Sequence, residues 1–453
     1  MSKKLQGLYK EVRKMDNLSA AWNHIYSNGI KPDKSSKTRA DIQDFKQHDI
    51  KHLQSLNGKL YRKTYKVPKA RAVAPKKKKG DGIRPLVIAD INTRIIQRSA
   101  LKVLESKRFI IDCLQVPTSF GGIPKGIRKE EKVGVEGAIR LLLDAIADGG
   151  NYYIKSDIKD FFTSIPLPTI YEILKERIDD DEFHKLIQAI TNLEVSNISD
   201  VDSKYHDLFD FDHNGTPQGC CLSSLFGNML LYEFDVVTNA REATCIRFLD
   251  DFIIVAPTQA LAWKAYNRGK KALRRHGLEL YDPKSPKQDK ASEGTIDSGV
   301  EFLGVDISGI YTQPSQKNCY NLLSAVDTII LSSKKGANSE ENVRYFYDKS
   351  YLKTLYKISN KVEGWGNQYK FCNERKRFSR IDRLIDKRIR EYTNHYHAKQ
   401  RNVDNNDTSS KRRNLGVYML SDCKQEPYWP NTKKVITKPD RMNETAYKTE
   451  ANA

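Results

Sequence analysis

The sequence lacks the features that mark secreted, membrane-spanning and zinc-binding proteins. Its seven cysteines are scattered, and no two are spaced as Cys-x-x-Cys, which argues against a zinc ribbon. No apolar stretch approaches the length of a membrane helix. The basic residues of segment 1–12 are not followed by an apolar segment, as they would be in a secretion signal. We therefore expect a soluble protein of the reducing cytoplasm, with no membrane partner.

Positive charge is what the sequence has in excess. Its 453 residues include 77 Lys and Arg against 57 Asp and Glu, a formal net charge of +20. Such an excess indicates a polyanionic partner, more often nucleic acid than an anionic membrane surface. The 23 tyrosines favour nucleic acid, because Tyr stacks on bases and contacts the backbone in grooves. The length suffices for two or three domains, each with a core of its own.

Two adjacent carboxylates interrupt an apolar stretch in the middle of the chain. Segment 245–256 reads CIRFLDDFIIVA, so Asp250 and Asp251 stand between runs rich in Ile, Val and Phe. These flanks predict two strands joined by a hairpin turn, in which Asp is tolerated. A plain turn would explain this pair. It would not explain a third carboxylate, Asp157, which follows another strand-like run, YYIKSD.

Asp157 beside Asp250 and Asp251 would form a group of carboxylates that can bind metal ions. Strands that are neighbours in one sheet would bring the three carboxylates into a cluster of like charge, which is unstable without cations. Two Mg²⁺ ions, or Mn²⁺ as a substitute, would satisfy the cluster, since Mg²⁺ takes carboxylate and phosphate oxygens. Two metals spaced for in-line displacement activate a 3′-hydroxyl and stabilise a pyrophosphate leaving group.

Two further segments are suited to binding phosphates. Segment 76–79 is a run of four lysines on a glycine turn, and Arg84 stands at the start of the apolar strand that follows. Arg grips phosphate oxygens with two parallel hydrogen bonds, whereas a Lys run alone is as readily a solvated loop. In GTPQG, Gly215 and Gly219 permit close approach of the backbone to a nucleotide, although a helix-entry turn explains them equally well.

The order and spacing of these segments resemble the successive motifs of reverse transcriptases. The matching segments are RPLVIADINTRIIQRSAL, SDIKDFF, GTPQGCCLSSLFGNMLL, RFLDDFIIVA, GLELYDPKS and EFLGVDIS. The resemblance covers about residues 15–400 and implies the α+β fold of a right-hand polymerase, with fingers, an antiparallel palm sheet with helices, and a helical thumb. It implies an N-terminal helical extension at 1–64, fingers with the start of the palm at 65–156, palm with finger segments at 157–313, thumb at 314–400 and a basic, polar tail at 401–453.

The resemblance also implies roles for single residues in catalysis. Asp157, Asp250 and Asp251 match the metal-binding carboxylates, and the carbonyl of Ile158 is expected to help hold a metal. Phe162 matches the bulky residue that lies against the sugar 2′ position, which implies a preference for deoxynucleotides.

Other matches concern the nucleotide and the primer. Arg84 with Lys77 or Lys78 matches the finger residues that hold the incoming dNTP, and Gln218 matches a residue near nucleotide and template. Lys284 matches the candidate acid for pyrophosphate departure, with Lys287 as its rival. The primer grip corresponds to Phe302, Leu303 and Gly304.

The branch of the family follows from segments outside these motifs. NLSAAWNHIYSNG and KVEGWGNQYKFCNERKRFSRIDRLIDKRIRE resemble the N-terminal extension and thumb of bacterial, group II intron-like enzymes, and KRRNLGVYML resembles the tails of defence-associated reverse transcriptases. We therefore expect an RNA-directed DNA polymerase that makes cDNA on a dedicated, structured noncoding RNA in antiphage defence. An intron or retron polymerase and a catalytically silent RNA-binding protein are the alternatives. The priming mode and a homo-oligomeric state stay open.

Overall fold

The computed structural model divides by compactness into two units. One is formed by Met1–Tyr320 with Gly366–Arg380, and the other by Asn321–Trp365 with Ile381–Ala453. This division does not test the boundaries predicted for fingers, palm, thumb and tail, which stay predictions. In the part of the chain that the structure describes, no helix is both long and apolar enough to cross a membrane. The described residues are 4–31, 34–75, 83–128, 133–209, 215, 219–240, 242–285, 290–336, 349–401, 411–412 and 415–417.

Four helices begin the first unit, and each buries an apolar face. They are α1 (Leu8–Val12), α2 (Met15–Gly29), α3 (Ser36–Gln47) and α4 (Asp49–Tyr61). The stretch NLSAAWNHIY has the spacing of an amphipathic helix, and its apolar residues Leu18, Ala21, Trp22 and Ile25 in α2 are all buried. The indole N–H of Trp22 donates to Asp49 at 2.9 Å, which satisfies its polar atom inside the core.

A short antiparallel hairpin and a long helix follow. The hairpin pairs β1 (Arg71–Val73) with β2 (Leu86–Ile88). The long helix is α5 (Ile91–Glu105), which begins where the Asp90 carboxylate accepts hydrogen bonds from the N–H groups of Asn92 and Thr93. Further elements of this unit are α6 (Arg108–Leu114), α7 (Gly134–Ala147), α8 (Phe161–Ser164), α9 (Leu167–Arg177), α10 (Asp181–Thr191), η1 (Ile198–Asp200), η2 (Ser203–Phe209), α11 (Ser223–Leu230), α12 (Tyr232–Thr238) and α13 (Gln259–Arg274).

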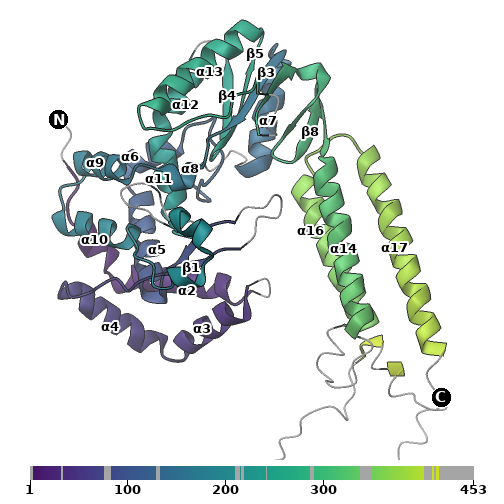
Figure 1. The fold of residues 1–453 in the computed structure, drawn as a ribbon, viewed down its shortest axis with the longest axis horizontal. Coiled ribbons are helices and arrows are strands. Elements are labelled where there is room, and N and C mark those ends of the chain that lie inside the picture. The colour runs from purple at the N-terminus through teal and green to yellow at the C-terminus, as the bar shows by residue number, and fades with distance from the viewer. Residues whose placement is uncertain are drawn as a thin grey trace, which may run out of the picture. The chain divides into compact units, whose positions relative to one another are not determined.

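The sheet that carries the predicted carboxylates has four antiparallel strands in the order β4-β5-β3-β6 (Figure 1). They are β3 (Tyr152–Asp157), β4 (Thr244–Phe248), β5 (Asp251–Ala256) and β6 (Ser292–Thr295). The predicted hairpin is therefore confirmed as β4 and β5. Phe252 and Ile254 join the core of α12 and α13, whereas Val255 faces the backbone of Gly150, just beyond α7. Consecutive buried residues in β5 show that both faces of this strand are covered.

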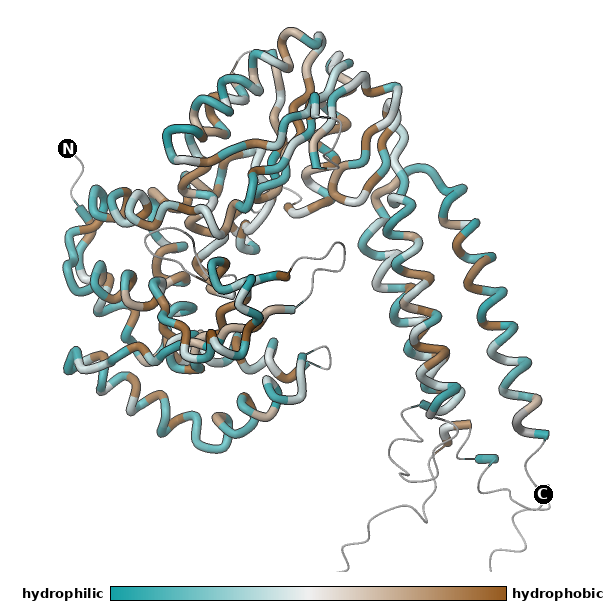
Figure 2. The backbone as a smooth tube through the Cα atoms, viewed as in Figure 1, coloured by the Kyte–Doolittle hydropathy of each residue, from teal (hydrophilic) through white to brown (hydrophobic). Residues whose placement is uncertain are grey.

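A second sheet of three strands and three long helices follow in the part of the chain that the structure describes. The sheet has the order β7-β8-β9, from β7 (Val300–Phe302), β8 (Val305–Ser308) and β9 (Tyr311–Pro314), after η3 (Ile296–Ser298). The helices are α14 (Gln316–Gly336), α16 (Tyr351–Tyr369) and α17 (Lys376–Arg401). In the second unit Val326, Ile330, Ile358 and Tyr392 form one core. Figure 2 shows hydrophobic and hydrophilic positions alternating along these helices, which is the pattern of helices with one apolar face.

Candidate active site

The four-stranded sheet brings the three predicted carboxylates to one place. β3 pairs with β5 in a register that sets Asp157 directly opposite Asp251. Asp250 stands in the turn between β4 and β5, and its carbonyl accepts a hydrogen bond of 3.3 Å from the Ile158 N–H. Side chains of directly opposite residues lie on the same face of an antiparallel pair, so Asp157 and Asp251 project together. The juxtaposition is present, and the role of these residues as metal ligands stays a prediction.

The pKa values of the Asp pair reflect this crowding. Desolvation, and then the charges of Asp157 and Asp251, raise the pKa of Asp250 to about 7. Asp251 keeps an exposed surface, yet desolvation and the charge of Asp157 raise its pKa to about 6. Asp157 is buried, and its Oδ1 atom has no hydrogen-bond partner among the described residues. Repelling carboxylates with an unpaired buried oxygen indicate a place suited to a cation.

Among the described residues, Lys290 is the lysine that forms an ion pair with this cluster. Its Nζ atom lies 2.6 Å from Asp157 Oδ2 and 4.8 Å from the centre of the Tyr281 ring. Sequence reasoning missed Lys290, although it belongs to the lysine-rich segment KSPKQDK that begins at Lys284. Lys284 itself stacks over the Trp263 ring, 4.6 Å from its centre. The role of Lys284 in pyrophosphate departure stays a prediction, and Lys287 lies outside the described residues.

The turn that carries Asp250 is strained and enclosed. Leu249 has a φ of +59°, in the left-handed region that side chains other than glycine rarely adopt. Gly121 lies against it so closely that a Cβ at this position would stand 2.5 Å from the Leu249 nitrogen. A side chain at position 121 would therefore displace the turn. Strain of this kind persists only where the surrounding structure enforces it, and it gathers at functional sites.

Two residues predicted to meet the incoming dNTP are described by the structure. Phe162 is half-buried on α8, and its ring centre lies 5.3 Å from that of Phe161. Arg84 is exposed, two residues before β2, and its N–H donates to the Pro75 carbonyl at 2.9 Å. The contacts of both with a nucleotide stay predictions. The other residues predicted for this contact lie outside the described part of the chain: Lys77, Lys78 and Gln218.

The predicted primer grip is a tight hairpin. Leu303 and Gly304 join β7 to β8 with φ values of +49° and +79°, the pattern of a two-residue turn that matches the twist of the strands. Phe302 is buried beneath the turn, and the Gly304 carbonyl accepts a hydrogen bond of 2.9 Å from the Ser315 N–H. The hairpin is thus held on both sides, and its contact with a primer stays a prediction.

Two cationic cavities lie beside Gly219. One of about 210 Å³ is lined by α2, α3 and α5 and includes Arg94 and Arg98. The other, of about 500 Å³, shares Arg94 and Gly219 and adds Arg71. In the described part of the chain neither Arg94 nor Arg98 forms a salt bridge, and burial lowers the pKa of Arg94. Asp41 and Asp90 also line the larger cavity and interact electrostatically with Arg94. Guanidinium groups that line a cavity are nevertheless suited to phosphate oxygens.

The carboxylate cluster fits a divalent cation by its chemistry. Within the described ranges, no three or more His, Cys, Asp and Glu side chains are arranged as a ready-made metal site, which agrees with Lys290 standing against Asp157. The donors are nevertheless the hard carboxylate oxygens that Mg²⁺ and Mn²⁺ prefer. The unpaired Oδ1 of Asp157 and the raised pKa values of Asp250 and Asp251 add to this fit.

The four-stranded antiparallel sheet carries its carboxylates on neighbouring strands and is preceded by the β1–β2 hairpin. This is the arrangement of the palm of a right-hand polymerase. Residues 75–307 match the family model described as reverse transcriptase (RNA-dependent DNA polymerase). Because this match covers 233 of the 453 residues, the chain belongs to the reverse transcriptase family. The predicted α+β right-hand polymerase fold is thereby confirmed.

Known relatives match about half of the chain. The group II intron-encoded protein LtrA of Lactococcus lactis subsp. cremoris is 27% identical over 233 residues, which are 50% of this chain and 34% of that protein. Protein YkfC of Escherichia coli is 29% identical over 42% of this chain and 46% of its own length. A partial Cas6-RT-Cas1–Cas2 complex shows 22% identity over 57% of this chain and 39% of its own, with a TM-score of 0.34. At that score the likeness has no bearing on function.

Proposed function

We propose that the chain is an RNA-directed DNA polymerase that adds deoxynucleotides to a primer by two-metal nucleotidyl transfer. The register of β3 and β5, which sets Asp157 opposite Asp251 and beside Asp250, carries this proposal. Family membership supports it. The chain spans about a third of the length of LtrA. Its activity and substrates are therefore inferred from the geometry of the site and need the experiment below.

The residues of the site divide the work. Mg²⁺, when bound, supplies activation of the primer 3′-hydroxyl and charge neutralisation of the pyrophosphate. Asp157, Asp250 and Asp251 would hold the cations, and the bound charge would relieve the mutual repulsion of the three carboxylates. Phe162 excludes a ribose 2′-hydroxyl. Lys290 releases Asp157 when the cations bind and then pairs with the phosphates of the nucleotide.

Loss of one carboxylate tests the polymerase. Replacement of residues that merely support metal ligands costs about 10-fold to 100-fold in activity, so loss of a ligand in Asp250→Asn should lower dNTP incorporation on a primed RNA template by more than about 100-fold. Asp148→Asn, a change of the same type at an exposed position after α7, is the matched control and should keep full activity. Wild-type incorporation by Asp250→Asn would refute the assignment, and no incorporation by the wild type on any primed RNA would favour a silent RNA-binding protein.

We further propose that the template is a dedicated, structured noncoding RNA and that its cDNA serves antiphage defence in the cytoplasm. The net charge of +20 and the arginines that line the two cavities support an RNA partner. The resemblance of KRRNLGVYML to the tails of defence-associated enzymes supports the biological role.

Purification from the native locus tests the template. Sequencing of the bound RNA should show enrichment of the transcript encoded beside the gene. Recovery of random cellular RNA would leave a general polymerase, and recovery of an intron would favour the intron enzyme. Phage plating on cells that carry the wild-type locus or its Asp250→Asn form tests the defence role, because protection should disappear with the carboxylate.

A further inference from the structure

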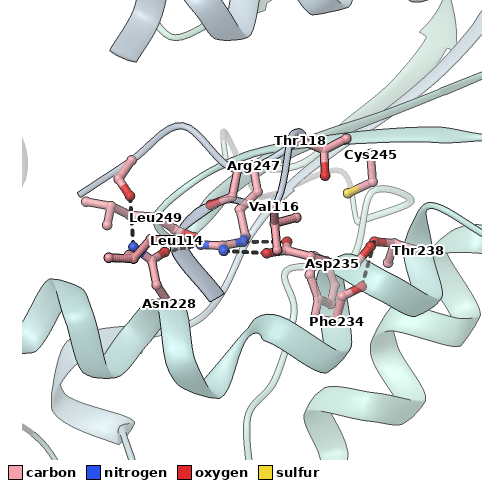
Figure 3. Close-up of polar contacts among 12 residues, drawn as sticks. Leu114, Val116, Thr118, Asn228, Phe234, Asp235, Thr238, Cys245, Arg247 and Leu249 are labelled. Carbon is pink, nitrogen blue, oxygen red and sulfur yellow. Dashed lines mark hydrogen bonds and ion pairs between the residues drawn. The ribbon is translucent and has the colours of Figure 1, made fainter. Parts of the chain in front are cut away.

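Arg247, three residues before Asp250, is a fully buried arginine. Its partner is Asp235 of α12, and both side chains have 0% exposure (Figure 3). The two groups form a fork, in which Arg247 Nε donates to Oδ1 at 2.7 Å and a terminal nitrogen donates to Oδ2 at 2.5 Å. This bidentate pair fixes the plane of the guanidinium.

The remaining terminal nitrogen of Arg247 reaches the turn of Asp250. It donates to the Leu249 carbonyl at 3.1 Å and to Asn228 Oδ1 at 3.0 Å (Figure 3). The Leu249 carbonyl belongs to the peptide bond that leads into Asp250, so the guanidinium sets the orientation of that peptide plane. Leu249 is also the residue with a φ of +59°, and this hydrogen bond helps to hold it there.

The opposite side of the turn is attached to the same arginine. The Asn228 side-chain amide donates to the Gly121 carbonyl at 3.1 Å, and Gly121 packs against the Leu249 nitrogen. The Arg247 backbone N–H donates to the Thr118 carbonyl at 2.9 Å, and its carbonyl accepts from Phe120 at 2.8 Å. The turn is therefore clamped between the guanidinium and a loop that Arg247 itself holds.

Stability alone gives no reason for an ion pair in this place. A buried ion pair generally contributes no more to stability than an apolar pair of similar volume, because both charges lose their hydration. An apolar pair, however, cannot donate a hydrogen bond to the Leu249 carbonyl. The contact that distinguishes Arg247 from a packing residue is thus the contact with the turn of Asp250.

We propose that Arg247 is a positioning residue for Asp250, held in place by Asp235, and that it sets the carboxylate of Asp250 for cation binding. The proposal rests on the proposed function of the carboxylate cluster. Arg247 touches neither nucleotide nor cation in this scheme. It acts through the Leu249–Asp250 peptide, so its loss should change the placement of Asp250 more than the fold.

The test separates positioning from stability with a double variant. Asp235→Leu/Arg247→Met removes both charges together, leaves no unpaired buried charge, and should keep the thermal unfolding midpoint close to that of the wild type. Arg247→Lys keeps the charge and loses the fork, and Asn228→Ala removes the link to Gly121. The matched control is Arg268→Lys, because Arg268 is half-buried and donates to the carbonyls of Val237 and Ala240, away from the turn.

Two readouts report the placement of Asp250. Mn²⁺ binding, followed by the loss of the free-ion electron paramagnetic resonance signal, needs no activity and should weaken about 10-fold to 100-fold in the double variant and in Arg247→Lys. The kcat for dNTP incorporation should fall about 100-fold, as for a catalytic group displaced by roughly 1 Å, with KM for dNTP nearly unchanged. Arg268→Lys should match the wild type in both.

The outcomes discriminate between the two proposals. A folded double variant with wild-type Mn²⁺ affinity and kcat would overturn the positioning role. If the double variant does not fold, wild-type Mn²⁺ affinity and kcat in Arg247→Lys and Asn228→Ala would overturn the positioning role. Wild-type protein that binds Mn²⁺ but incorporates no nucleotide would refute the polymerase function and leave the Mn²⁺ readout to decide the role of Arg247.

Discussion

The metal-free protein should lose stability as the pH rises, and Asp250→Asn should remove the part of this loss that the Asp250 carboxyl contributes. Desolvation and the neighbouring carboxylates hold the folded-state pKa of Asp250 at about 7, against about 3.9 in an unfolded chain. The folded state therefore keeps a proton that the unfolded chain releases between these values. A difference of about 3 pH units corresponds to about 4 kcal/mol of stability, which is present below pH 4 and lost by pH 8.

Thermal unfolding in EDTA at pH 4.5 and pH 8 measures this effect. The amide that replaces the carboxylate in Asp250→Asn cannot ionise, so the variant should unfold at nearly the wild-type temperature at pH 4.5 and roughly 5 °C higher at pH 8, given the unfolding entropy of a unit of this size. Addition of Mg²⁺ at pH 8 should stabilise the wild type, by about 1.4 kcal/mol when the ion is at ten times its dissociation constant, and should have little effect on the variant. Asp148→Asn is the control and should follow the wild type throughout.

Either of two results would refute this reasoning. If the variant were less stable than the wild type in EDTA at pH 8, carboxylate repulsion would not dominate the site. If the difference between the two proteins were the same at pH 4.5 and pH 8, it would arise from packing and not from the ionisation of Asp250. A gain that grows with pH and shrinks by about 1.4 kcal/mol on addition of Mg²⁺ at ten times its dissociation constant is the signature expected of a carboxylate cluster suited to cations.

Three further changes give distinct outcomes. Phe162→Ala should raise ribonucleotide use relative to deoxynucleotide use by about 10-fold or more, measured by single-nucleotide incorporation, because it opens room for the 2′-hydroxyl. Lys290→Met should tighten Mn²⁺ binding by about twofold to fivefold, as expected for loss of a half-exposed ion pair that competes for Asp157, and should raise KM for dNTP. Arg94→Gln/Arg98→Gln should weaken binding of single-stranded RNA and lower the slope of log affinity against log salt by about 1.4, from two lost phosphate contacts.

Each of these three predictions can be refuted by a specific result. An unchanged dNTP-over-rNTP preference in Phe162→Ala would place the sugar selection elsewhere. Weaker Mn²⁺ binding in Lys290→Met would show that the lysine supports the carboxylates and does not compete for them. A double replacement of the exposed Lys102 and Lys175 by Gln removes the same charge from positions that line neither cavity, and an equal fall in salt slope there would reduce the cavities to ordinary basic surface.

Single helices and hairpins could be predicted from the sequence, because the signals that specify them lie within the same short segment. The buried face of α2 follows from the spacing of Leu18, Trp22 and Ile25, and the start of α5 follows from the capping carboxylate of Asp90. The β4–β5 hairpin follows from two apolar runs around Asp250 and Asp251. Each of these signals lies within one turn of helix or one hairpin, so no distant contact has to be known.

The candidate site was only partly within reach. The three carboxylates could be named, because each follows a strand and because their order matches a known family, but the register that opposes Asp157 to Asp251 is a long-range pairing. Lys290 could not be chosen over Lys284 or Lys287, since all three stand in one lysine-rich segment and only the path of the backbone decides which ammonium reaches Asp157.

The sequence by itself determined the kind of chemistry, because the residue types of a carboxylate cluster and their order along the chain are properties of the chain alone. Tertiary structure decided what surrounds that chemistry. In a strand pattern Arg247 reads as an ordinary position beside Phe248, and nothing local shows that its charge is buried. Its burial depends on Asp235 of α12, and its contact with Leu249 depends on a strained turn against which Gly121 packs. A buried charge exists only where a distant partner compensates it, and that partner is supplied by the fold.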